Sequence, residues 1–279
     1  MKYAPDVSRR VFLVAVFAVV SCGVTNAQTQ SNTVLYSCRW DKSGASDTKW
    51  FAGGSQSALQ QFVDRNRQSH RLTHLSGFSH QGPALYCAIM KPSSDRKWAW
   101  EERLTRSELN RYVNSTHKGW KLEMFNGYEH AGQVFYTALI RDQPGPNFRW
   151  EEQMTQQQVN KFINVTGRGA RLTHLYGYTV GGSPRFDAIL SSQSATLPWE
   201  EKLTQKGLNA YLTKNRNCLL ICLNGYRHQG KLHFTTVVDC GRTQTFHGEE
   251  AIPFNKLQTL DAEFRRQGFS VTLLNGISQ

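Results

Sequence analysis

Residues 71–78 read Arg-Leu-Thr-His-Leu-Ser-Gly-Phe, and residues 171–178 read Arg-Leu-Thr-His-Leu-Tyr-Gly-Tyr. Looser copies of this segment occupy residues 121–128 and 219–226. Their glycines belong to a series whose members are spaced by 50, 50, 48 and 51 residues: Gly77, Gly127, Gly177, Gly225 and Gly276. A regular period of this length predicts a repeat architecture, here with five units.

Each copy continues in a pattern that is typical of a β-hairpin. In four units a second glycine follows five residues after the first, and an aromatic residue then comes two positions before a small one. Upstream, the triplet Trp-Glu-Glu at residues 100–102, 150–152 and 199–201 predicts a short strand. A threonine then begins a helix, and Thr105 with Glu108 fits a capping box. The predicted unit is therefore strand, helix, strand, strand.

The two ends of the chain suggest how the units are arranged. The fifth unit stops soon after its glycine, and residues 33–40 have the sequence of the strand that it lacks. We therefore predict that this N-terminal strand completes the fifth unit, and that five α+β units close into a propeller-like ring without exposed sheet edges. An open array of units is the alternative. The single domain, residues 28–279, divides at about residues 49–96, 97–147, 148–197, 198–245 and 246–279 plus 33–40.

Residues 1–27 have the features of a signal peptide. Ser8-Arg9-Arg10 precedes an apolar stretch over residues 11–20, and Thr25-Asn26-Ala27 offers a small-residue cleavage site. The apolar stretch is too short to span a bilayer as a helix. We therefore expect a secreted protein without membrane insertion.

The charge of the chain limits its partners. The formal net charge is +12 at pH 7, and about +10 remains without residues 1–27, which favours binding to anionic surfaces such as acidic polysaccharides. The sequence has no helix-turn-helix, zinc-finger or RNA-binding signature, so nucleic acid is not an expected partner. A basic surface without a specific partner is the alternative.

Two extracellular modifications are expected. Asn114 and Asn164 begin N-glycosylation triplets, whose use depends on the host. Cys218 and Cys240 lie on the two strands of one predicted hairpin and are candidates for a disulfide. Cys38 and Cys87 are expected on equivalent strands of adjacent units, too far apart to bond. With Cys222 the cysteines after residue 27 are odd in number, so one stays free or joins two chains.

Side chains at the hairpins are the candidate ligand contacts. They fall on equivalent positions of different units: Tyr128, Tyr178 and Tyr226 beside the periodic glycines, and His80, His130 and His228 at the turns. Packing against the neighbouring unit is the alternative for the tyrosines, and a purely local role in the turn is the alternative for the histidines. Equivalent positions of neighbouring units lie too far apart to share one metal ion, so neither a metal site nor a cofactor is predicted.

The paired glutamates resemble catalytic carboxylates, but their repetition favours a structural role. Successive residues of a strand face opposite sides, so one glutamate of each pair is expected to bond an arginine or a backbone amide. The less regular segment with Cys240, His247 and Glu249 is where a thiol nucleophile, a base and an orienting acid would have to lie.

The repeated pattern resembles a known family. Its elements are [Arg/Lys]-Leu-x-x-Leu-x-Gly-Tyr, a second glycine five residues on, aromatic-x-Ala, Trp-Glu-Glu and Leu-Thr before a helix. Together they look like the bacterial tandem repeat domain, which is also found before the β-lactamase-like catalytic domain of fungal polyglycine hydrolases. The resemblance covers residues 33–279 and implies an exported repeat scaffold. It implies no catalytic residues, because in those hydrolases the nucleophile belongs to the other domain. Five such units in a ring also resemble the pentein α/β-propeller, at the level of the fold alone.

These observations lead to three functional hypotheses. The first is a secreted, non-enzymatic binding or scaffold module for an anionic extracellular polymer or a protein partner. The second is a secreted hydrolase or guanidine-modifying enzyme with a site in the ring centre near Cys240 and His247. The third is an extracellular matrix or coat protein that assembles through its odd cysteine.

Overall fold

The computed structural model of the chain describes residues 33–42, 47–143, 148–166, 169–192, 197–242 and 244–277. Contacts divide the chain into residues 1–32 and one compact unit from Thr33 to Gln279. The predicted signal peptide, residues 1–27, lies outside the described residues. Within the described ranges, no helix is both long and apolar enough to cross a membrane.

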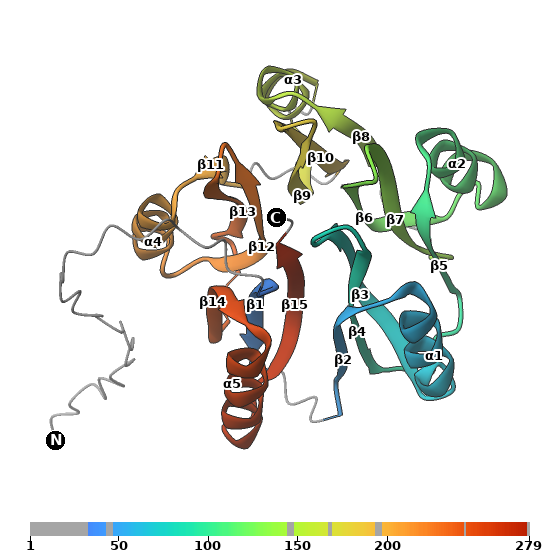
Figure 1. Cartoon of the computed structure of the whole chain (residues 1–279), viewed down its shortest axis with the longest axis vertical. Coiled ribbons are helices and arrows are strands. Elements are labelled where there is room, and N and C mark those ends of the chain that lie inside the picture. The colour runs from blue at the N-terminus through green and yellow to red at the C-terminus, as the bar shows by residue number, and fades with distance from the viewer. Residues whose placement is uncertain are drawn as a thin grey trace, which may run out of the picture. The chain divides into compact units, whose positions relative to one another are not determined.

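Five three-stranded antiparallel sheets, each accompanied by a helix, make up the compact unit in its described ranges (Figure 1). The strands of the first four sheets, in spatial order, are β2 (Lys49–Gly54), β4 (Ala84–Pro92) and β3 (His70–Ser79); β5 (Trp98–Leu104), β7 (Gln133–Arg141) and β6 (Lys121–His130); β8 (Phe148–Met154), β10 (Ser183–Ser191) and β9 (Arg171–Val180); β11 (Trp199–Leu203), β13 (Lys231–Asp239) and β12 (Leu219–His228). The predicted α+β repeat of strand, helix, strand and strand is confirmed.

The fifth sheet combines strands from the two ends of the described chain. β14 (Phe246–Pro253) and β15 (Ser270–Ile277) both pair with β1 (Leu35–Asp41), which lies between them. Tyr36 of β1 lies opposite Gly276, just as Tyr86 of β4 lies opposite Gly77 in the first sheet. The N-terminal strand therefore occupies, in the fifth sheet, the place that β4 has in the first.

Each helix begins at a polar or proline cap and covers its sheet with a buried aliphatic residue. The helices are α1 (Gln56–Asn66), α2 (Arg106–Arg111), α3 (Gln156–Lys161), α4 (Gln205–Lys214) and α5 (Phe254–Arg266). The predicted capping box of Thr105 and Glu108 is present, and Thr155 forms one with Gln158. Single π-helical turns, η1 (Tyr112–Thr116) and η2 (Phe162–Thr166), extend α2 and α3.

Glycines serve two different purposes in the repeat. In the hairpin between β6 and β7, Ala131 and Gly132 have φ angles of 51° and 75°, and two successive positive φ angles are the mark of a type I′ turn. The periodic glycines instead permit close contact between sheets. A methyl group on Gly77 would lie 2.6 Å from the ring of Tyr128 in the next unit, so only glycine fits.

The same close contact recurs between successive units. The further pairs are Gly127 with Tyr178, Gly177 with Tyr226, Gly225 with Ile277, and Gly276 with Phe78. The last of these pairs joins β15 to β3, and Ser76 of β3 also donates a hydrogen bond to Leu274 O of β15 at 3.2 Å. β15 of the fifth unit therefore lies against β3 of the first.

Asparagine side chains hydrogen-bond across these contacts. Gly77 N donates to Asn126 Oδ1 at 3.1 Å, and Asn126 Nδ2 donates back to Gly77 O at 2.8 Å. Gly177 N donates to Asn224 Oδ1 at 2.8 Å. The amides are buried, so each bond satisfies a backbone group that water does not reach.

Asp187 takes the place of an asparagine between the second and third units. The third unit has Tyr176 before its periodic glycine, and a tyrosine offers no amide. Gly127 N instead donates to Asp187 Oδ2 of β10 at 2.6 Å, while Asp187 Oδ1 accepts from Gln153 N at 2.9 Å and from Tyr178 OH at 3.2 Å. Burial raises the pKa of Asp187 to about 7, although these three donors favour the charged carboxylate.

The second glutamate of the Trp-Glu-Glu triplets also bonds across unit boundaries. Glu152 forms an ion pair with Arg106, the first residue of the preceding helix. Glu201 accepts a hydrogen bond from Gln156 Nε2 at 2.8 Å in the same arrangement. Both glutamates are buried. Glu152 therefore pairs with an arginine, as predicted, whereas Glu201 bonds the side chain of a glutamine.

Candidate functional site

The three tyrosines proposed as ligand contacts are buried between units. Tyr128, Tyr178 and Tyr226 expose at most 2% of their surface. Tyr128 OH forms a hydrogen bond with Tyr86 OH at 2.9 Å, and Tyr226 OH donates to Glu201 O at 2.9 Å. Their rings fill the space beside the periodic glycines. The structure thus places them in the packing role that was the alternative for them, out of reach of a ligand.

The three turn histidines lie at the ends of hairpins. His80 is buried, whereas His130 and His228 are partly exposed. A ring nitrogen of His228, Nδ1, lies 2.9 Å from Gly182 O in the preceding hairpin, and the ring of His130 contacts that of Phe135. Among the residues that the structure describes, no group of three potential ligands could hold a metal ion. The contacts of His130 and His228 are thus with the hairpins themselves.

The structure also tests the suggested catalytic role of Cys240 and His247. Cys218 and Cys240 form the predicted disulfide, so Cys240 has no thiol to act as a nucleophile. His247 stacks on the ring of Phe264 at a centroid distance of 4.3 Å. The suggested combination of Cys240 with His247 therefore lacks its nucleophile in this structure.

The free cysteines in the described ranges are Cys38, Cys87 and Cys222, all buried. Cys38 and Cys87 belong to the same hydrophobic cluster and form no disulfide with each other. Burial raises the pKa of the Cys222 thiol to about 11 and that of Cys87 to about 12. Thiols that are buried and protonated are poorly placed to join two chains.

The two glycosylation candidates lie at equivalent positions. Asn114 and Asn164 are exposed in the π-helical turns that follow α2 and α3. Asn114 Nδ2 contacts Asn110 one turn earlier, at 3.4 Å. An exposed asparagine side chain is accessible to a modifying enzyme, whichever host produces the chain.

A pocket of about 270 Å³ lies at the end of the sheets where β3, β6 and β9 begin. We call it the strand-start pocket. It is lined by residues of three units: Arg71, Thr73, Lys121, Leu122, Glu123, Phe148, Thr173, Ile189 and Ser191. Residues of one repeat position thus converge here from different units, because the strands that follow the helices pack against one another.

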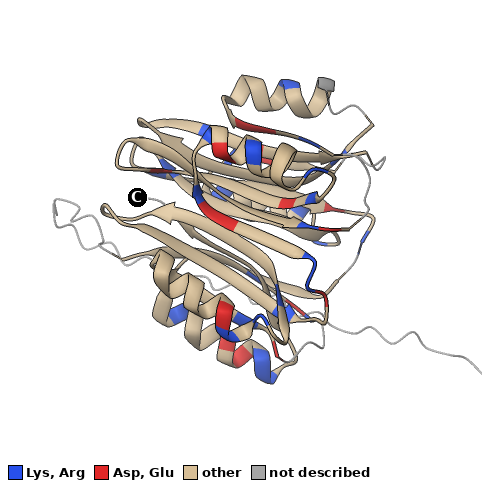
Figure 2. Ribbon diagram, turned by 90° about the vertical axis from the view of Figure 1, so that its right-hand side faces the viewer, with Lys and Arg blue, Asp and Glu red and all other residues tan. Residues whose placement is uncertain are grey.

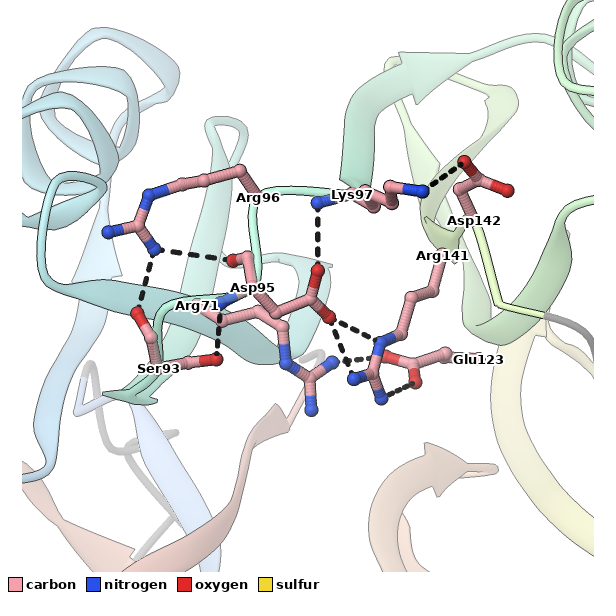
Figure 3. A network of polar contacts seen from close by, with 8 residues as sticks. All are labelled: Arg71, Ser93, Asp95, Arg96, Lys97, Glu123, Arg141 and Asp142. Carbon is pink, nitrogen blue, oxygen red and sulfur yellow. Dashed lines mark hydrogen bonds and ion pairs between the residues drawn. The ribbon is translucent and has the colours of Figure 1, made fainter.

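Ion pairs hold one wall of the strand-start pocket. Glu123 lies between two guanidinium groups, 2.9 Å from Arg71 Nη1 and 3.6 Å from Arg141 Nη1 (Figure 3). Arg141 also pairs with Asp95 at 2.7 Å, and the backbone N–H of Lys97 donates to the same carboxylate at 2.9 Å. The Lys97 amide and then Arg141 hold the pKa of Asp95 below its usual value. These side chains are at most a quarter exposed, so their pairing is screened less than that of surface charges.

Positive charge is concentrated behind Arg71. Lys91 stands opposite it on β4. Burial lowers the pKa of Lys91, and the nearby charges of Arg39 and Arg71 lower it further, against the opposing effect of Asp41. A lysine whose pKa is lowered by neighbouring cations lies where an anion is favoured.

Lys121 is the cation of the pocket that is open to a ligand. It is partly exposed and forms no ion pair with any residue in the described ranges. Its neighbours Thr73 and Thr173 donate their hydroxyl protons to Ile89 O and Ile189 O, each at 3.2 Å. The hydroxyl oxygens keep lone pairs that can accept hydrogen bonds from a ligand. The arrangement can thus bind a molecule that carries both an anionic group and hydroxyl donors.

One feature of the sequence coincides with this pocket. The first residue of the repeated segment is basic in three units and not in the fourth and fifth: Arg71, Lys121, Arg171, Leu219 and Ser270. At this position the first three units are therefore basic and the last two are neutral. Only the structure shows that two of these positions, Arg71 and Lys121, line the same cavity.

A scan against protein families gives matches at two segments. Residues 53–93 and 155–190 match the polyglycine hydrolase-like, structural repeat. Parts of the first and third units are thus similar to this structural repeat. The two matched segments include a helix and the hairpin that follows it, in the first and third units. This is the repeat family that the sequence pattern resembles. No curated protein matches the chain significantly.

Proposed function

We propose that the chain is a secreted, non-enzymatic module that binds an anionic extracellular polymer at the strand-start pocket. The observation that carries the proposal is Lys121, which lies beside Arg71 in the pocket and has no ion-pair partner in the described ranges. Figure 2 shows basic and acidic residues interspersed on helices and strands, with most of the ribbon uncharged. The net charge of about +10 on residues 28–279 supports attraction of an anionic polymer over longer range.

Export is part of this proposal. Residues 1–27 have the sequence features of a signal peptide, and the bond between Cys218 and Cys240 suits an oxidising compartment. The disulfide also weakens the enzyme hypothesis, since it leaves no thiol at Cys240. The strand-start pocket offers charges and acceptors that suit binding.

The proposal is tested by retention on an anionic polysaccharide resin over a salt series. Residues 28–279 contain the whole compact unit and are the protein to use. We expect retention that fades with salt, because exposed charges are screened, and that is weakened by Lys121→Gln. Lys206→Gln, at an exposed position of α4, is the matched control with the same loss of charge. Elution without retention on any anionic resin would overturn the proposal, and capture of a protein partner instead would point to the scaffold alternative.

The module also includes the predicted ring, and we propose that the five units close through the contact of β15 with β3. The packing of Phe78 on Gly276 supports closure, because it repeats the packing of Tyr178 on Gly127. Gly276→Ala would bring a methyl group to 2.1 Å from Phe78, and Gly127→Ala to 2.4 Å from Tyr178.

In a closed ring both substitutions lower the free energy of unfolding, by about 1–3 kcal/mol each. Urea unfolding of the two variants measures this. If the units form an open array, Gly276→Ala is tolerated while Gly127→Ala is not, and closure is then rejected.

A further inference from the structure

We propose that the strand-start pocket binds one acidic sugar residue of a polysaccharide, through its charged group and its ring hydroxyls together. This inference rests on the proposed function and narrows it, because a merely basic surface would bind any polyanion. The pocket is formed by β3, β6, β8, β9 and β10, so it belongs to three units at once.

The size of the pocket suits a single ring. Its volume is about 270 Å³, just below the range of roughly 300–1,000 Å³ that is usual for larger small-molecule ligands. A pyranose ring with its substituents fits such a space, whereas a protein segment or a stacked pair of bases does not. Leu122 and Ile189 form a buried floor, and the half-buried ring of Phe148 adds an apolar wall. The C–H face of a sugar packs on such a wall.

The charged side chains of the pocket favour a ligand with one anionic group. Lys121 is available to it, whereas Arg71 is already engaged by Glu123 at 2.9 Å and keeps only its other N–H groups. An ammonium binds an anion as a point charge, without a demand for planar geometry. The pocket therefore selects for a negative charge at one point, next to Lys121.

The hydrogen-bond acceptors of the pocket favour a ligand with hydroxyl donors. Thr73 and Thr173 have committed their protons to backbone carbonyl groups, so towards the pocket they are acceptors. The Glu123 carboxylate is an acceptor as well. A ligand without donors, such as polyphosphate, would cover these oxygens without bonding them, and that is unfavourable. A sugar with free hydroxyls next to its charged group satisfies both requirements.

The test compares three probes on residues 28–279 by titration calorimetry. The probes are a uronate oligosaccharide, the same oligosaccharide with its carboxylates reduced to alcohols, and polyphosphate. We expect the uronate to bind most tightly. Lys121→Gln should weaken uronate binding about tenfold, since a hydrogen bond to a charged group is lost. Thr173→Val should weaken it several-fold and leave polyphosphate binding unchanged.

Controls separate failure of this inference from failure of the proposed function. Lys206→Gln should bind the uronate as the parent does, and thermal unfolding of each variant checks that it is folded. If the uronate and polyphosphate bind equally, and Thr173→Val affects neither, the module binds polyanions without sugar recognition and the inference is rejected. If no anionic probe binds, the proposed function itself is rejected.

Discussion

Asp187 should make the stability of this protein fall as the pH rises from 4 to 7. The carboxyl group is fully buried between the second and third units, where burial raises its pKa from the usual 3.8 to about 7. In that pH range the folded chain still holds the proton, whereas the unfolded chain has released it. A rise in pH stabilises the state that binds fewer protons, which here is the unfolded chain, so the free energy of unfolding declines.

The magnitude follows from the difference between the two pKa values. A shift from 3.8 to about 7, at about 1.4 kcal/mol for each pKa unit, gives a loss of about 4 kcal/mol. The stabilising contribution is complete below pH 4, declines between pH 4 and 7, and is absent above pH 7. Asp187→Asn removes the titration. The amide retains one acceptor oxygen for Gly127 N or Gln153 N, and loss of the other bond lowers stability by about 1–3 kcal/mol at every pH.

The assay is urea unfolding of the parent and Asp187→Asn at several pH values from 4 to 8. At pH 4 the variant should be less stable than the parent, and by pH 8 their difference should have moved about 4 kcal/mol in favour of the variant. His74 and His174, whose pKa values burial lowers to about 4, titrate in both proteins and cancel in this difference. Parallel stability curves for the two proteins would refute the reasoning.

Four further substitutions test the local structure by urea unfolding. Ala131→Asn places a residue that tolerates positive φ in a type I′ turn and should raise stability by about 0.5–1 kcal/mol. Gly181→Ala, at the equivalent φ of 54°, should lower stability by about 1 kcal/mol. Equal effects of the two substitutions would contradict the turn assignment. Cys240→Ser opens a disulfide between residues 22 apart and should lower stability by about 3 kcal/mol, a loss that reduction of the parent should reproduce. Thr155→Ala removes the cap of α3 and should lower stability by about 1 kcal/mol, and no change would mean that the cap contributes nothing.

Local structure followed closely from the sequence. Thr105 and Thr155 cap helices, because a side-chain oxygen reaches backbone N–H groups only three residues away. Cys218 and Cys240 face each other because they end the two strands of one hairpin. Each of these predictions depends on residues that are near one another in the chain, or that a short turn brings together.

The roles of individual side chains did not follow in the same way. Tyr128 stands beside a hairpin glycine in the sequence, and its burial depends on Gly77, which belongs to another unit. Asp187 is unremarkable in its own strand, and only the packed units show that it is buried and accepts a hydrogen bond from Gly127 N. Such partners lie about one repeat apart, and a sequence pattern does not state which face of one unit meets which face of the next.

The sequence by itself determined the period, the unit, the helix caps and the disulfide, because recurring glycines and turn residues express local backbone requirements that any fold of this chain must meet. Only the tertiary structure decided which of the repeated residues are buried and which line a cavity. Lys121 and Thr173 are 52 positions apart in the chain and share a pocket because β6 packs against β9. Burial and electrostatic environment are properties of such contacts between units, and they arise when the units pack together.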